Sequence, residues 1–159
     1  MSSFEELAVE VAGKNINTTT LLATDYLNHF NEIIMILEMV PDMPDMLEEC
    51  KNWQPKTYVQ HFADSSFSNK ELAIKAYDYV PTKFKKAFEY VVGEINRIIL
   101  QSMDKMEELK ESPEELREFC RRTFADLHTL TEATGGVING YGSTETQKSV
   151  DTISFTADP

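Results

Sequence analysis

The chain has 159 residues, 42% of them hydrophobic, which is enough to build one domain with a modest extension. Its formal net charge of -12 argues against a nucleic-acid partner and against an anionic membrane, because both require a basic surface. Cys50 and Cys120 form no CxxC motif, and the acidic N-terminus does not have the pattern of a secretion signal, so we expect a cytoplasmic protein.

The first half of the chain is predicted to form helices separated by polar or proline-containing turns. A capping-box pattern, "SSFEEL", predicts a short helix over 3–13. Apolar residues at helical spacing predict a longer helix over about 19–39, which Pro41 and Pro44 end. Shorter helices are expected directly after Pro44, within "KTYVQHF", and after a second capping box over 68–81. The methionines of "MILEMVPDMPDM" fit a binding surface, but we interpret them as core residues.

Two long helices are predicted in the second half. One spans 82–111, and the other begins at the "ESPEEL" boundary, with Pro113 in its first turn, and ends at Gly135. Because the connection between them is short, they should be antiparallel neighbours. The expected fold is therefore an all-α bundle of three to four main helices over 1–135. Residues 136–159 are predicted to be a flexible linker that ends in a partner-docking peptide.

The last residues include an apolar cluster that a solvated tail would not need. The stretch "TQKSVDTISF" is similar to the terminal peptide with which the CheZ family of chemotaxis phosphatases binds its response regulator. The resemblance covers about ten residues and implies a receiver domain as the partner. The matching partner-binding positions are Gln147, Val150, Asp151, Ile153 and Phe155. Packing of this tail on its own bundle is the alternative, and we keep both open.

A polar interruption of the 19–39 helix is the second candidate site. In "DYLNHFNEII", Asn28 and Glu32 are four residues apart and so lie on one face of a helix. The pattern is similar in outline to the catalytic helix of the CheZ family, with the acid and the amide exchanged. This resemblance implies catalytic roles for both residues in hydrolysing the aspartyl-phosphate of a receiver. The protein itself would need no cofactor, and Mg²⁺ is expected only on the receiver.

Two alternatives to a phosphatase remain. One is a non-catalytic helical adaptor or scaffold, with a homodimer left open as its assembly. The other comes from "DLHTLTEATGG", which is similar to the phosphorylated segment of histidine phosphotransfer domains and implies His128 as the phosphorylated residue. The three histidines have no ExxH pairing, so we expect no metal site.

Overall fold

The computed structural model describes residues 3–141 and 143–153. Within these ranges all regular structure is helical, which confirms the predicted all-α class. The α-helices are α1 (Ser3–Val11), α2 (Leu27–Leu37), α3 (Leu47–Cys50), α4 (Tyr58–Asp64), α5 (Lys70–Tyr77), α6 (Thr82–Glu108), α7 (Pro113–Ile138) and α8 (Ser143–Asp151). Two 3-10 helices, η1 (Thr24–Tyr26) and η2 (Pro44–Met46), lead directly into α2 and α3.

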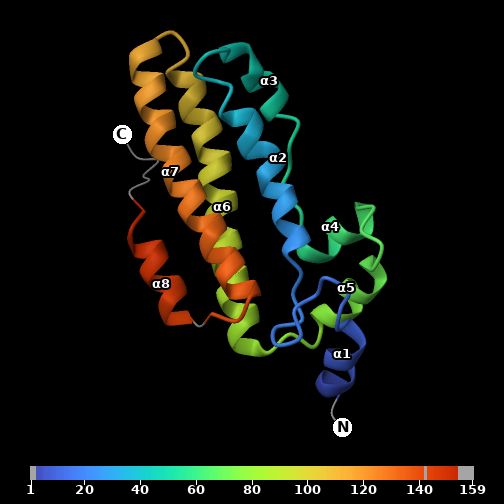
Figure 1. Ribbon diagram of the computed structural model, residues 1–159. Coiled ribbons are helices and arrows are strands. Elements are labelled where there is room, and N and C mark those ends of the chain that lie inside the picture. The colour runs from blue at the N-terminus through green and yellow to red at the C-terminus, as the bar shows by residue number, and fades with distance from the viewer. Residues whose placement is uncertain (1–2, 142, 154–159) are drawn as a thin grey trace.

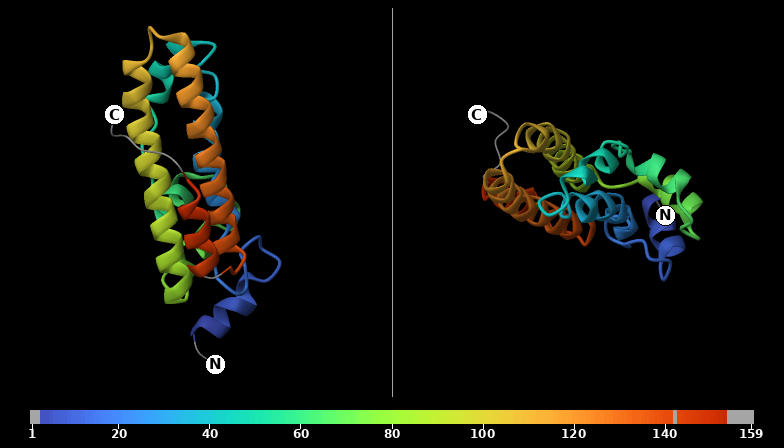
Figure 2. Two further views of the ribbon diagram at one scale, coloured as in Figure 1. Left: turned by 90° about the vertical axis from the view of Figure 1, so that its left-hand side faces the viewer. Right: turned by 90° about the horizontal axis from the view of Figure 1, so that it is seen from above.

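The long hairpin of α6 and α7 organises the fold. The two helices have 27 and 26 residues, so each is about 40 Å long, and they run antiparallel as predicted. Figure 1 shows α2 and α3 along one side of this hairpin and α8 along the other, and the left view of Figure 2 shows α8 in front of α6 and α7. The short helices α1, α4 and α5 gather near one end of the hairpin.

Aromatic rings fill the core where α2, α4 and α6 meet. Tyr26 is fully buried, and its ring centroid lies 5.4 Å from that of Phe30, 5.5 Å from Tyr58 and 5.5 Å from Phe88. The Tyr26–Phe30 pair is edge-to-face, an arrangement that adds about 0.5–1.5 kcal/mol beyond the burial of area. This cluster fixes the start of α2, which carries the candidate site.

The start of α2 differs from the prediction, because the helix was expected from about residue 19. The Asn17 side-chain oxygen accepts the backbone N–H groups of Thr19 at 2.8 Å and Thr20 at 2.9 Å, which holds this segment in a turn. Leu21 follows with a positive φ of 63° and is fully buried. The helical path therefore begins only at Thr24.

The end of α7 also differs from the prediction, because the helix passes through Gly135 and Gly136 and continues to Ile138. The stop is Gly140, with φ of 102°, whose N–H bonds the Val137 carbonyl at 3.0 Å. The Tyr141 N–H bonds the Gly136 carbonyl at 2.8 Å, which completes a Schellman motif. Gly136 leaves room for the Tyr141 ring, since a Cβ there would lie 2.7 Å from Cδ2 of that ring.

The segment after Gly136 is not simply a linker. Residues Ser143–Asp151 form α8, which packs in the groove between α6 and α7. The sequence left open whether the tail binds a partner or packs on its own bundle, and the structure places α8 on the bundle.

Candidate functional site

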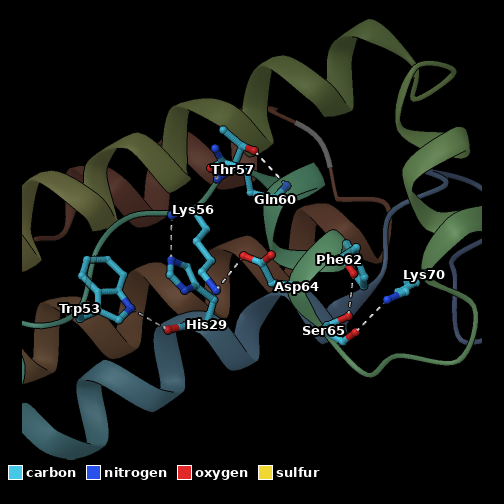
Figure 3. Close-up of polar contacts among 9 residues, drawn as sticks. All are labelled: His29, Trp53, Lys56, Thr57, Gln60, Phe62, Asp64, Ser65 and Lys70. Carbon is cyan, nitrogen blue, oxygen red and sulfur yellow. Dashed lines mark hydrogen bonds and ion pairs between the residues drawn. The ribbon is translucent and has the colours of Figure 1, made fainter.

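A histidine on α2 holds the strap that joins α3 to α4. The His29 Nε2 accepts the backbone N–H of Lys56 at 3.1 Å, and the Trp53 indole N–H donates to the His29 carbonyl at 3.3 Å (Figure 3). The imidazole and indole rings stack with their centroids 4.8 Å apart. The strap is held at its other end by a capping box between Thr57 and Gln60.

The His29 imidazole is held neutral by its surroundings. Burial, together with smaller effects of the nearby His61 and Lys56, lowers its pKa to about 4. A neutral ring is required here, because Nε2 can accept the Lys56 N–H only when it carries no proton. His29 therefore acts as a hydrogen-bond acceptor that positions the strap.

Asp25 joins α4 to the first turn of the α2 region. One of its carboxylate oxygens lies 3.0 Å from the His61 Nε2, and the other accepts the Asn28 amide N–H at 3.1 Å. No hydroxyl or thiol of a described residue is hydrogen-bonded to the His61 ring. Asp25 can orient the His61 imidazole, but no described residue hydrogen-bonded to that ring could serve as a nucleophile. The sequence placed Asp25 beside the candidate site and gave no signal for His61, which is distant along the chain.

The two predicted catalytic residues are accessible. Asn28 and Glu32 are both exposed on α2, one turn apart, as their spacing predicts. The Asn28 amide bonds Asp25, whereas Glu32 makes no hydrogen bond or ion pair with any residue that the structure describes. The helix therefore presents on one face an amide and a carboxylate that has no partner among the described residues. That arrangement can bind a cation or orient a water molecule.

His128, the predicted phosphorylated residue of the alternative, is also accessible. It lies on α7 with its side chain 59% exposed, and its Nε2 is 3.1 Å from Glu38 Oε1. A carboxylate at this distance repels an incoming phosphoryl group. Glu132, one helical turn after His128, is a further exposed carboxylate near this histidine.

The tail residues divide between two faces of α8. Gln147 and Asp151 are exposed and bonded to each other at 2.8 Å. Val150 is 9% exposed, and Ile153 is partly buried against the core. Phe155 lies outside the described residues. The predicted apolar anchor Val150 is thus covered by its own bundle and Ile153 is partly covered, which is the alternative that the sequence left open.

The two candidate sites are not brought together. Asn28 and Glu32 lie on α2, on one side of the α6–α7 hairpin, and α8 lies on the other side (Figures 1 and 2). A partner cannot contact α2 and α8 as one continuous surface in this conformation.

A pocket of about 290 Å³ opens between the strap and α6. Its lining includes Tyr26, Tyr77 and Phe88, and Gly93 leaves space beside it. The Asn96 Oδ1 in this wall has no hydrogen-bond partner among the described residues. That oxygen is itself buried, so it cannot bind a ligand unless the side chain moves, and we assign no ligand to the pocket.

No protein-family model matches the chain, and no similar curated protein or solved structure was found. Within the described residues, no group of three or more His, Cys, Asp or Glu side chains is placed to hold a metal ion. None of the described helices is long and apolar enough to cross a membrane.

Proposed function

We propose that this chain is a cytoplasmic signalling protein of bacteria that binds the receiver domain of a response regulator with the exposed face of α2. The observation that supports the proposal is the pair Asn28 and Glu32, which lie one turn apart, exposed, on a helix fixed by buried aromatic rings. The Glu32 carboxylate has no partner among the described residues, so it is available to a lysine of the receiver.

The C-terminal peptide would act as a second, releasable contact in this proposal. Val150 is buried in the α6–α7 groove, so the peptide binds a receiver only after α8 leaves that groove. Gly140 provides a backbone position with positive φ just before α8. A released peptide would stay tethered near the bundle, which raises its effective concentration for a receiver already held on α2.

In its catalytic form, the proposal is that the protein accelerates dephosphorylation of the receiver. The Asn28 amide would hold a water molecule in line with the phosphorus of the aspartyl-phosphate, and Glu32 would bind the neighbouring lysine of the receiver. An acyl phosphate is already reactive, so correct positioning would supply most of the gain in rate. The receiver would bring its own Mg²⁺.

Binding and phosphate decay with purified receiver domains from the same source test this proposal. We expect Asn28→Ala and Glu32→Ala to weaken binding to a phosphorylated receiver and, in the catalytic form, to slow phosphate loss. Glu49→Ala, an exposed acid on α3, is the matched control and should change neither. If none of the receivers binds, the proposal is wrong. If they bind and phosphate decay is the same with and without the protein, the non-catalytic adaptor is the correct form.

The phosphotransfer alternative is supported by one observation, the exposure of His128. It predicts acid-labile phosphate on the protein after incubation with a phosphorylated receiver, and none after His128→Gln. Glu38→Gln should increase the labelling, because it removes the carboxylate beside Nε2. Absence of label on both the wild type and Glu38→Gln excludes this alternative.

A further inference from the structure

Three methionines that the sequence suggested as core residues lie on the surface. Met35, Met39 and Met43 are 67%, 41% and 52% exposed, so the core interpretation is wrong for them. The fourth methionine of the stretch 35–46, Met46, is partly buried and packs against the core. Exposed apolar side chains are common singly, but three in a regular row need an explanation.

The three side chains form one row, which we call the methionine stripe. They are spaced four residues apart. Met35 lies on α2, Met39 lies in the turns that follow it, and the Met43 N–H bonds the Met39 carbonyl at 2.9 Å. Leu37 and Val40, between them in sequence, are buried in the core. The stripe therefore lies on the side of this segment that faces away from the core.

Acidic side chains accompany the stripe. Residues 35–49 contain Glu38, Asp42, Asp45, Glu48 and Glu49 and no lysine or arginine. Glu38 pairs with His128 at 3.1 Å, and Asp42 pairs with Arg117 at 2.9 Å. Both pairs are largely exposed, so each contributes little, and an incoming cation can replace the present partner at small cost.

A hollow continues the surface beyond Met43. It has a volume of about 460 Å³ and is lined by Asp42, Met43, Pro44, Asp45, Lys110 and Glu111. Three of these six side chains are acids and one is basic. Lys110 is already paired with Glu107 at 3.5 Å. The lining of the hollow thus combines the apolar Met43 and Pro44 side chains with a net negative charge.

We propose that the methionine stripe binds a basic amphipathic helix of a partner protein. The apolar side of that helix would lie on Met35, Met39 and Met43, whose unbranched thioether side chains adapt to varied shapes. Its lysines and arginines would face Glu38, Asp42 and Asp45. A second copy of this chain is disfavoured as the occupant, because two acidic rims would face each other across the dimer, and each chain carries a net charge of -12. This inference does not depend on the receiver proposal.

A titration with a defined probe tests the inference. The probe is a labelled amphipathic Leu/Lys peptide of about 18 residues, and a peptide of the same composition with scrambled order controls for net charge alone. We expect the full-length protein to bind the amphipathic peptide at least about tenfold more tightly than the scrambled one, a difference of about 1.4 kcal/mol. Replacing the stripe with Met35→Gln, Met39→Gln and Met43→Gln together should remove that preference.

Two further variants sharpen the result. Val9→Gln with Leu100→Gln removes exposed apolar side chains outside the stripe and should leave the affinity unchanged. Glu38→Gln, Asp42→Asn and Asp45→Asn together should weaken binding at low salt and reduce its salt dependence. Equal binding of the two peptides, or equal binding by the wild type and the methionine variant, overturns the inference. So does a wild-type dimer that the methionine variant converts to a monomer, because the stripe would then bind a second copy.

Discussion

The Nε2 of His29 accepts the backbone N–H of Lys56 at 3.1 Å, and this bond joins α2 to the strap before α4. The strap continues the contact through Trp53, which stacks on the imidazole and bonds the His29 carbonyl. One neutral side chain therefore holds a long connection onto the helix that carries the candidate site.

The stability of the fold should fall between pH 7 and pH 5 because of His29. Its pKa of about 4 in the folded chain is below the ordinary value of 6.5, so the unfolded chain binds a proton more readily in that range. The contribution is present above pH 6.5 and is lost as the pH falls toward 4. We expect a loss of about 1–2 kcal/mol between pH 7 and pH 5, measured by urea unfolding.

Two histidine variants separate this effect from general acid destabilisation. His29→Gln keeps an acceptor near the Nε2 position without a titratable ring, so it should flatten the pH dependence. His128→Gln removes an exposed histidine and should leave the dependence in place. An unchanged pH profile in His29→Gln would show that the imidazole is not the titrating group.

Removing the hydroxyl of Thr20 should destabilise the fold. This buried hydroxyl donates to the Ile138 carbonyl at 2.6 Å and accepts the Leu22 N–H at 3.1 Å, so it joins the loop before α2 to the end of α7. Thr20→Val has a similar shape but leaves both backbone groups unpaired. We expect a loss of about 1–3 kcal/mol in the free energy of unfolding. Thr131→Val, at a half-buried position of α7, is the control and should cost less, because its hydroxyl bonds only the His128 carbonyl in an exposed setting.

The three helical glycines should respond differently to alanine. A Cβ at Gly93 meets nothing within 4 Å, and one at Gly135 meets Leu27 Cδ1 at an ordinary 3.7 Å. Gly93→Ala and Gly135→Ala should each stabilise the fold by about 0.5–1 kcal/mol. Gly136→Ala should lose that gain, because its Cβ would lie 2.7 Å from the Tyr141 ring. Equal melting temperatures for Gly135→Ala and Gly136→Ala would contradict the ring contact.

The two long helices were predictable from local patterns. Apolar residues recur at helical spacing along α6 and α7, and Pro113 marks the start of α7. The errors came from contacts between distant residues. Gly135 and Gly136 have the composition of a helix end, yet the Leu27 and Tyr141 side chains cover them and the helix continues. The same holds for α8, which packs on α6 and α7. The local sequence does not show whether Val150 is covered by this hairpin or by a partner.

The candidate site was predictable in part. The spacing of Asn28 and Glu32 fixes their shared face wherever the segment is helical, and the structure shows both exposed. The partners Asp25–His61 and His29–Lys56 were not predictable, because each joins two elements whose contact depends on the packed aromatic core. The methionine row was visible in the sequence, but its exposure depends on which side of the segment faces the bundle.

Introducing a charge at Val150 should release α8 from the hairpin. Val150 is 9% exposed, so Val150→Asp places a carboxylate where α8 meets the core, at a cost of about 2 kcal/mol or more. Detachment costs less than unfolding the bundle, because α8 follows Gly140 and contacts only part of the hairpin. Hydrogen exchange should therefore show lost protection of the amides of 146–151, while those of α6 and α7 stay protected. Lys148→Asp, at an exposed position of the same helix, is the matched control. Unchanged protection of α8 in Val150→Asp would mean that Val150 does not hold this helix in the groove.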